Sequence, residues 1–295
     1  MARSASVRVE VFADLNADVG EAPHWDERTK TLLFVDLTAG EVVRYDQSGV
    51  KLGSFSVGQE VGAAVPRRNG GLVLAVRDGI ATASDTGEGF GLTAPVERDI
   101  PGNRMNDAKC DPAGRLLAGT TAFDFSPHSA ALYRVEPDWS FEPIVRDVTQ
   151  SNGIAWSPDG SRMYFIDSAT QGVDVFDFDV GTGSAGHRRR LVTVERAHGV
   201  PDWMTTDNHG NLWVACFGGA AVRCYSPAGV QLAEVRFPVA QVTSCAFGGS
   251  DLADLYVTSA AYRLSTDQLK REPHAGATFV CRPGAVGMPA SSFAG

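Results

Sequence analysis

The chain has 295 residues, of which 43% are hydrophobic and 21% charged, and its net charge at pH 7 is −9. This composition is typical of a globular protein with enough apolar residues for a large core. The acidic balance argues against nucleic acid or an anionic membrane as the main partner. No apolar run approaches the roughly 20 residues that cross a bilayer, so we expect no membrane partner.

Residues 1–7 hold no apolar segment of the kind found in secretory signals. The five cysteines are odd in number and show no CxxC spacing, and most lie in apolar segments. This usage is typical of reduced, buried thiols. We therefore expect a cytoplasmic protein.

Six short apolar segments recur along the chain, and they predict strands. Their first residues are about 40 to 49 positions apart, and most follow a polar turn such as Asp111–Gly114 or Asp207–Gly210. Most are followed by a second segment in which apolar and polar residues alternate. Only Ser265–Arg271 has the pattern of a short helix. The six segments are Leu32–Asp36, Leu72–Val76, Leu116–Thr120, Met163–Asp167, Leu212–Cys216 and Leu255–Ser259.

A repeat of roughly 40 to 50 residues with about four strands is typical of a propeller blade. We therefore predict an all-β fold, a six-bladed β-propeller that forms one domain over residues 1–295. Blades stacked in a ring bury both faces of each sheet, which one blade cannot do alone. A pair of β-sandwiches with similar spacing is the alternative.

Ligand-binding residues of a propeller lie on the loops that enter the innermost strands, and polar clusters recur there in four of the six repeats. Glu21, Asn152 and Asp202 precede their turns by similar distances, so we expect them to converge on the channel. Two carboxylates and an amide oxygen form a hard ligand set suited to Ca²⁺, Mg²⁺ or Mn²⁺. Without a cation, one of the two carboxylates would have to take a proton.

Each of these residues also has a structural alternative. Glu21 could cap a turn, Asn152 could adopt a left-handed backbone before a glycine, and Asp202 could form an Asx-turn. Arg104 and Asn106, from the cluster of the third repeat, could instead form hydrogen bonds between blades. The six histidines show no HxH or HExxH spacing, which argues against a histidine-based zinc site.

Several motifs together resemble one known family, the senescence marker protein 30/gluconolactonase/luciferin-regenerating enzyme family, also called regucalcin-like. The motifs follow the family's order and cover nearly the whole chain. They are Gly20-Glu21-x-Pro23-x-Trp25, Asn103-Arg104-x-Asn106-Asp107-x-Lys109, Asp111-x-x-Gly114-Arg115, Ala118-Gly119-Thr120, Ser151-Asn152-Gly153, Ser157-Pro158-Asp159-Gly160, Pro201-Asp202, Gly210-Asn211-Leu212-Trp213-Val214-Ala215 and Val242-Thr243-Ser244-Cys245-Ala246-Phe247-Gly248-Gly249.

The resemblance implies a six-bladed propeller with one divalent metal in its channel that hydrolyses sugar lactones to aldonic acids. Carried over by motif, Glu21, Asn152 and Asp202 match the metal ligands. Arg104 and Asn106 match the substrate-binding positions. Asp124 falls where some members bind sugar hydroxyls through an acid. We expect Asp107 and Lys109, from the same motif as Arg104, to be structural, because successive residues in a strand point to opposite faces.

Two positions depart from the family pattern. The family commonly has glycine after Pro-Asp, where this chain has Trp203. That indole could narrow the pocket, stack on a ligand or pack between blades. The family's methionine after Gly-Thr is Thr121 here. Both departures bear on the substrate more than on the metal.

A mechanism follows from these residue types. The metal acts as a Lewis acid on the lactone carbonyl and lowers the pKa of a bound water, and Asp202 is the candidate general base. Arg104 would hold the carbonyl or ring oxygens, while Asn106 and Asp124 would bind hydroxyls. Ca²⁺ is the leading metal candidate, with Zn²⁺, Mg²⁺ or Mn²⁺ as alternatives. We expect a monomer or a small homo-oligomer.

Two other functions remain open. One is a metal-dependent esterase or organophosphate hydrolase, and the other is a calcium-binding, regucalcin-like protein without turnover. Two further motif interpretations are unfavourable. Gly181–Gly186 matches GxGxxG, but a strand-like segment follows it where a dinucleotide site needs a helix. The chain contains no GxSxG, the usual serine hydrolase elbow.

Overall fold

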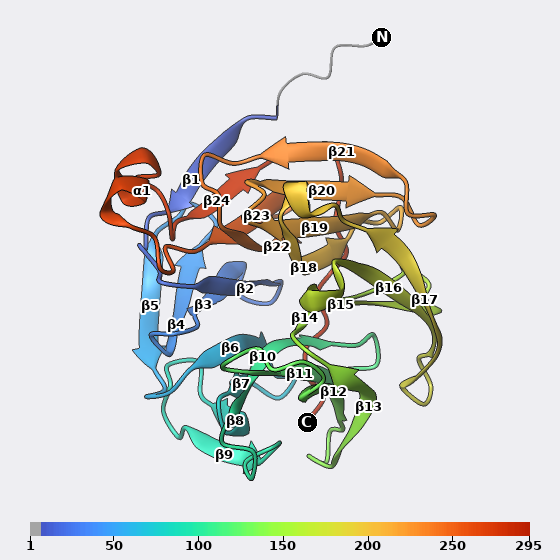
Figure 1. The fold of residues 1–295 in the computed structure, drawn as a ribbon. Coiled ribbons are helices and arrows are strands. Elements are labelled where there is room, and N and C mark those ends of the chain that lie inside the picture. The colour runs from blue at the N-terminus through green and yellow to red at the C-terminus, as the bar shows by residue number, and fades with distance from the viewer. Residues whose placement is uncertain (1–6) are drawn as a thin grey trace.

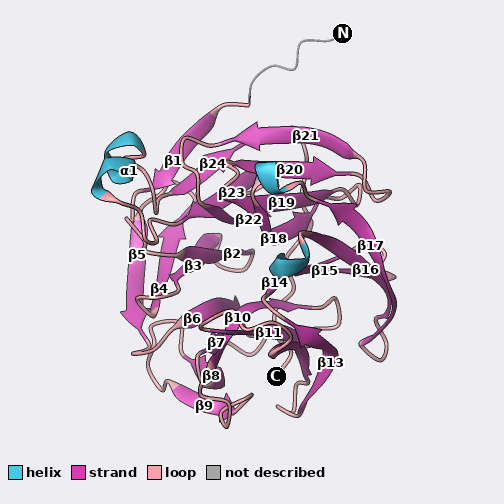
Figure 2. Ribbon diagram, viewed as in Figure 1, coloured by secondary structure: helices cyan, strands magenta, loops and turns pink. Residues whose placement is uncertain are grey.

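Six four-stranded antiparallel sheets surround a central channel in the computed structural model, which describes residues 7–295 (Figure 1). The predicted six-bladed, nearly all-β architecture is confirmed, and strands dominate the view in Figure 2. Within the described residues, no helix is long and apolar enough to span a membrane. Most of the N-terminal segment used to argue against a secretory signal lies outside the described residues.

The blades follow one another along the chain, and each runs from an inner to an outer strand. Blade 1 comprises β2 (Gly20–Asp26), β3 (Thr31–Asp36), β4 (Glu41–Asp46) and β5 (Lys51–Ser56). Blade 2 comprises β6 (Val61–Pro66), β7 (Leu72–Val76), β8 (Gly79–Ala83) and β9 (Gly91–Ala94). Blade 3 comprises β10 (Asn103–Cys110), β11 (Leu116–Ala122), β12 (Ala130–Val135) and β13 (Phe141–Val148).

The second half of the ring has the same plan. Blade 4 comprises β14 (Ser151–Trp156), β15 (Arg162–Asp167), β16 (Gly172–Asp179) and β17 (Ser184–Thr193). Blade 5 comprises β18 (Val200–Thr206), β19 (Leu212–Phe217), β20 (Ala221–Tyr225) and β21 (Gln231–Arg236). Blade 6 comprises β22 (Val242–Gly248), β23 (Asp254–Ser259), β24 (Thr278–Cys281) and β1 (Val9–Ala13).

Blade 6 closes the ring with strands from both ends of the chain. The N-terminal strand β1 pairs antiparallel with β24, for example Val9 with Cys281 and Val11 with Phe279. This sheet therefore joins an N-terminal strand to C-terminal strands by backbone hydrogen bonds. The ring is closed by these bonds as well as by packing between blades.

The helices are short and lie in connections between strands. They are η1 (Ser168–Thr170), η2 (Arg196–His198) and α1 (Thr266–Arg271). The Ser265 hydroxyl accepts from the Gln268 backbone N–H, and the Gln268 side chain accepts from the Ser265 N–H, which forms a capping box. The helix predicted at Ser265–Arg271 is confirmed.

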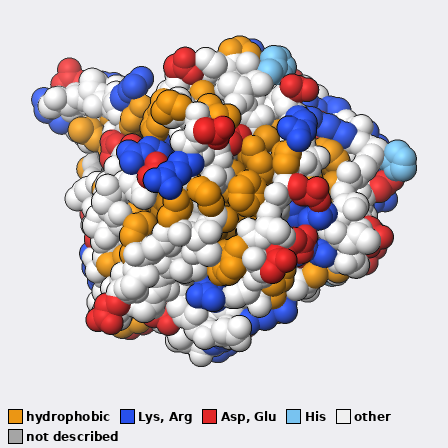
Figure 3. Space-filling model, turned by 90° about the horizontal axis from the view of Figure 1, so that it is seen from below, with side chains coloured by type: hydrophobic (Ala, Val, Ile, Leu, Met, Phe, Trp, Pro, Cys, Tyr) orange, Lys and Arg blue, Asp and Glu red, His pale blue; other side chains and the backbone are white. Residues whose placement is uncertain are grey.

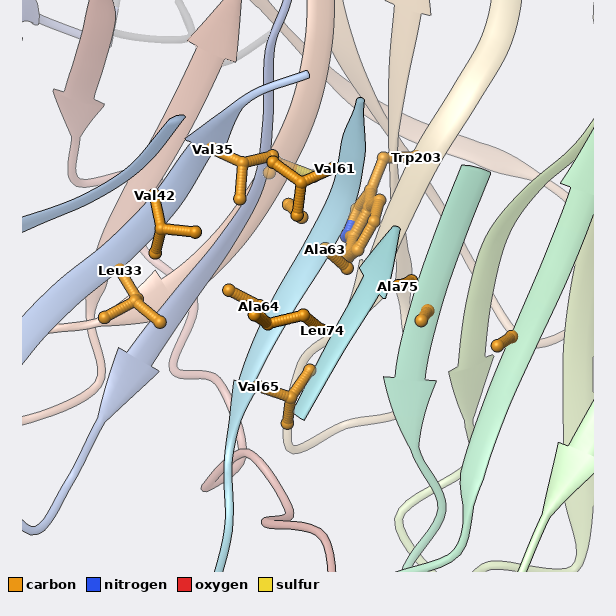
Figure 4. Packing of buried hydrophobic residues seen from close by; sticks show 14 of the residues in the cluster. Leu33, Val35, Val42, Val61, Ala63, Ala64, Val65, Leu74, Ala75 and Trp203 are labelled. Atoms are coloured by element: carbon orange, nitrogen blue, oxygen red, sulfur yellow. The ribbon is translucent and has the colours of Figure 1, made fainter. Parts of the chain in front are cut away.

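Burial explains why the apolar segments become the second strand of each blade. Every residue of β3 is buried, whereas five of the six residues of the outer strand β5 are exposed. Leu33 and Val35 of blade 1 belong to the same buried cluster as Val61 and Val65 of blade 2 (Figure 4). The hydrophobic core therefore lies between blades, and it requires the full ring.

The polar turns before these strands are held by their aspartates. The Asp111 carboxylate accepts from the backbone N–H groups of Ala113, Gly114 and Arg115 at 2.8 to 2.9 Å. Gly114 has φ of 97°, a conformation that favours glycine. Asp207 accepts in the same way from His209 and Asn211, so these turns belong to the scaffold.

In all six blades, the pairing register between the innermost strand and the second strand shifts at corresponding positions. Such bulges place an additional residue in the strand and re-aim its side chains. The bulges line the channel between its two mouths. The shifts lie between Glu21 and His24, Val61 and Ala63, Met105 and Ala108, Ser151 and Ile154, Pro201 and Met204, and Val242 and Cys245.

The C-terminal segment crosses the far side of the channel in Figure 1. The Asn208 N–H donates to the Val286 carbonyl at 2.9 Å, and the Arg68 N–H donates to the Phe293 carbonyl at 2.8 Å. Residues 286–293 therefore bridge blades on opposite sides of the ring, and they cover one mouth of the channel.

The predictions for the cysteines and for Gly181–Gly186 are confirmed. All five cysteines are free and buried. Gly181–Gly186 forms the hairpin between β16 and β17, and the basic residues 187–190 are exposed on β17, the outer strand of blade 4. On the side drawn in Figure 3, acidic, basic and hydrophobic side chains are interspersed. The net negative charge is therefore not gathered in one patch on that side.

Candidate functional site

A cavity of about 490 Å³ opens at the channel mouth opposite the C-terminal segment. Five of the six predicted site residues line it, and the inner strands of four different blades supply them. They are Glu21, Arg104, Asn106, Asn152 and Asp202. The bulges explain this convergence, because each lies at or beside the point where its inner strand changes register.

Glu21 is held by a residue of the neighbouring blade. Its carboxylate accepts a short hydrogen bond from the Ser244 hydroxyl, which also accepts from the Ala22 N–H at 3.3 Å. Burial raises the pKa of Glu21 to about 7, although the Ser244 hydrogen bond and the Arg104 charge oppose that shift. The ionised form of Glu21 is therefore costly without further positive charge.

Asp202 is more buried, with 8% of its surface exposed. Burial raises the pKa of Asp202 well above its ordinary value, and the negative charges of Glu21 and Asp107 raise it further. Arg104 lowers it only in part. Two carboxyl groups thus oppose each other's ionisation at the same site.

Asn106 and Asn152 are fixed by hydrogen bonds to one another and to their surroundings. The Asn106 Nδ2 donates to the Ser151 carbonyl and to Asn152 Oδ1, each at 2.7 Å. The Asn152 Nδ2 donates to Ser168 Oγ at 2.8 Å. These bonds leave the Asn152 amide oxygen a second lone pair, which can face the cavity.

Arg104 is the cation nearest to this acidic group. Its Nη1 donates to the Met105 carbonyl at 2.9 Å and to Asn106 Oδ1 at 2.7 Å. Burial lowers the pKa of Arg104, while Glu21 and Glu60 raise it. The guanidinium lies 6.0 Å from the centre of the Phe123 ring, so one face is covered by an aromatic side chain.

The donor set fits a divalent cation. Glu21 and Asp202 are carboxylates with raised pKa values, and a cation between them would restore their ionised forms. Residues 7–295 contain no cluster of three or more His, Cys, Asp and Glu side chains arranged to hold a metal. The third oxygen here belongs to an amide, Asn152, and oxygen ligands of this kind suit Ca²⁺ or Mg²⁺.

Asp124 departs from the prediction, because it does not line the cavity. Its exposed carboxylate accepts from the Ser126 N–H at 2.9 Å. Its neighbours Phe123 and Phe125 line the cavity instead. The physical reason is the turn after β11, in which Phe125 adopts a left-handed φ of 56° and the intervening side chain points outward.

Trp203 does not line the 490 Å³ cavity either. It is 3% exposed and packs in the interblade cluster with Ala63 (Figure 4). Trp203 and Lys109 instead border a second cavity of about 280 Å³ toward the covered mouth. The Lys109 ammonium lies 4.7 Å from the centre of the indole ring and donates to the Met204 carbonyl at 2.8 Å. Of the three interpretations, packing between blades is the one that the structure supports.

Sequence reasoning gave Asp107 a structural role and Ser244 none. Thr243 lies five residues before the turn that begins at Gly248, as Asp202 lies five before Asp207, so the repeat comparison leads to Thr243 and not to its neighbour Ser244. Both carboxyl oxygens of Asp107 are buried without a hydrogen-bond partner among the described residues. Burial raises the pKa of Asp107 well above its ordinary value, and the Lys109 charge opposes this. No sequence signal distinguishes the buried Asp107 from an aspartate on the surface.

The fold and the cavity define a class, a six-bladed β-propeller with an acidic site on its channel axis. Residues 19–261 match the model of the SMP-30/Gluconolactonase/LRE-like region. The chain therefore belongs to this family, which confirms the resemblance drawn from its motifs.

Individual relatives agree with this assignment. The chain is 40% identical to regucalcin of Danio rerio over 296 residues, which cover 99% of this chain and all of the relative. A solved luciferin-regenerating enzyme superimposes with a TM-score of 0.92 at 34% identity, covering 98% of this chain and 100% of that one. A regucalcin of Agrobacterium tumefaciens, described as calcium-binding, superimposes with a TM-score of 0.94 at 26% identity, covering 99% of each chain.

Proposed function

We propose that the protein is a metal-dependent hydrolase that opens lactones to hydroxy acids. One observation carries the proposal: two carboxyl groups, whose pKa values are raised by burial, lie with an amide oxygen in a cavity open at one channel mouth. Membership of a family whose description includes gluconolactonase supports a lactone as substrate. The resemblance implies a sugar lactone, which is one member of this class.

Glu21, Asn152 and Asp202 would hold the cation, with Ca²⁺ as the leading candidate. A bound divalent cation would supply Lewis-acid polarisation of the ester carbonyl. The Ser244 hydroxyl keeps the Glu21 carboxylate oriented. The Asn106 side chain fixes Asn152, because it donates to that amide oxygen from the adjacent blade.

Asp202 is the proposed general base. It would take a proton from the attacking water as the new C–O bond forms, and return that proton to the leaving ring oxygen as the ester bond breaks. With the cation bound, Asp202 would be ionised and therefore able to accept this proton. Arg104, at the cavity wall, would donate hydrogen bonds to the substrate's oxygens.

The alternatives are the same chemistry on an acyclic ester or organophosphate, and calcium binding without turnover. The second is favoured by the description of the Agrobacterium tumefaciens relative as calcium-binding. Turnover distinguishes these functions, whereas calcium affinity is common to all of them.

A panel of γ- and δ-lactones and simple esters, assayed with and without EDTA, tests the proposal. We expect lactone hydrolysis that EDTA abolishes and Ca²⁺ restores. Asp202→Asn should lower kcat by about 100-fold or more, whereas Asp138→Asn, at an exposed turn of blade 3, should not change it. If no lactone or ester is hydrolysed with any added divalent metal, both enzyme hypotheses are wrong. If Asp202→Asn keeps both its rate and its metal affinity, the role of Asp202 is wrong.

A further inference from the structure

The outer wall of the substrate cavity is rich in aromatic side chains. Phe123, Phe125, Phe217 and Tyr262 line it, together with aliphatic side chains such as Val200. Phe123 and Phe125 are 47% and 48% exposed, which is high for phenylalanine. Clustered exposed apolar side chains at a concave surface are typical of a binding site.

The polar groups on the cavity floor are largely bonded to one another. Asn106 uses both its amide group and its carbonyl oxygen within the protein. Ser168 accepts from Asn152 and donates to the Pro201 carbonyl. At the rim, the Thr38 hydroxyl donates to Asp18. Among the described residues, Arg104 and Glu60 keep hydrogen-bonding groups free at the cavity. Hydroxyl groups of a polyhydroxylated ring that lie against Asn106, Ser168 and Thr38 would nevertheless find few free partners, which is costly.

The backbone of the turn after β11 directs the side chains of Phe123 and Phe125, and not that of Asp124, to the cavity. Phe125 has a left-handed φ of 56°, which is rare for a bulky residue. Its N–H donates to the Ala122 carbonyl at 3.1 Å, which closes the turn. The turn directs Phe123 and Phe125 to the cavity, while Asp124 faces solvent.

We infer that the preferred substrates are lactones with a hydrophobic alkyl or aryl substituent and few hydroxyl groups. This inference rests on the proposed function. The ester group would lie toward Glu21, Asn152 and Asp202, and the hydrophobic substituent against Phe123 and Phe125. Water adds to the carbonyl carbon, the ring C–O bond breaks, and the proton returns to the ring oxygen, so the product is a hydroxy acid.

The test compares lactones that share a six-membered ring. We expect kcat/KM to be at least about 100-fold higher for δ-decalactone and dihydrocoumarin than for glucono-δ-lactone, because each methylene group in an apolar pocket is worth about tenfold or more. The variant Phe125→Asn removes the aromatic ring, and asparagine tolerates the left-handed backbone conformation at this position. The variant should lower kcat/KM for δ-decalactone about tenfold or more relative to that for unsubstituted δ-valerolactone. Phe141→Asn, an exposed phenylalanine of blade 3 outside the cavity, is the matched control.

The outcomes separate this inference from the proposed function. If kcat/KM for glucono-δ-lactone equals or exceeds that for δ-decalactone, the inference is overturned while the proposed function stands. The same conclusion follows if Phe125→Asn keeps the wild-type preference for δ-decalactone over δ-valerolactone. If no lactone is hydrolysed, the proposed function fails, and binding of the ring-opened acids decides the inference. Saturation-transfer NMR should then detect 5-hydroxydecanoate and not gluconate, and the reverse result overturns it.

Discussion

Gly62 offers the sharpest test of how the bulges position the site. It occupies the bulge of β6, and a Cβ atom added there would lie 1.6 Å from the carbonyl oxygen of Asn106 on β10. Ordinary contact begins at 3.4 Å, so Gly62→Ala would force the two inner strands apart by about 1.8 Å. The obstructing atom belongs to the backbone, which cannot rotate away as a side chain can.

We expect Gly62→Ala to lower the free energy of unfolding by about 3 kcal/mol, the upper range for overpacking. Displacement of Asn106 should also lower kcat/KM, because the side chain of Asn106 holds Asn152. Urea denaturation followed by circular dichroism measures the first effect, and lactone hydrolysis the second. Gly53→Ala is the control, since nothing lies within 4 Å of its added Cβ. If the two variants agree within about 0.5 kcal/mol, the bulge of blade 2 does not need glycine and the reasoning is refuted.

Three further predictions concern single residues. Ser244→Ala should weaken Ca²⁺ binding about tenfold in calorimetry, because the Glu21 carboxylate loses its orienting partner; unchanged affinity would contradict this. Trp203→Ala should lower the free energy of unfolding by about 3 to 5 kcal/mol, whereas a changed KM with intact stability would instead indicate a pocket residue. Burial lowers the pKa of His24 from 6.5 to about 4, so the unfolded state takes up the proton first as pH falls. The contribution of His24 to stability should therefore be complete above pH 6.5 and be lost by up to about 3 kcal/mol toward pH 4. The difference in urea midpoint between the wild type and His24→Gln should change over this range, because the carboxyl groups that titrate there are common to both proteins.

The blade architecture could be predicted because every repeat uses the same physical device. Each aspartate or glycine turn is followed by a strand that is buried on both faces, such as β3 or β19, and that burial requires a continuous apolar segment. The site residues Glu21, Asn152 and Asp202 share a common distance from their turns, so the repeat also predicted that they would meet at one cavity.

The environment of Asp124 could not be predicted from its position after Ala118-Gly119-Thr120. Which of Phe123, Asp124 and Phe125 faces the cavity depends on the left-handed φ of Phe125, and a phenylalanine carries no local preference for that conformation. Trp203 follows Asp202 directly, yet it lines the other cavity, because successive residues in a strand point to opposite sides.

The six bulges give this propeller a chemistry that can be changed one blade at a time. Each inner strand offers a side chain at the same stage of its path, ranging from the absent side chain of Gly62 to the amides of Asn106 and Asn152, the acid of Asp202 and the hydroxyl of Thr243. The turns and second strands that fold the blade lie elsewhere in the repeat. A substitution at one bulge can thus alter the charge or hydrogen bonding around the channel axis while the residues that fold that blade stay the same, so metal binding and substrate choice can diverge between relatives without a change of architecture.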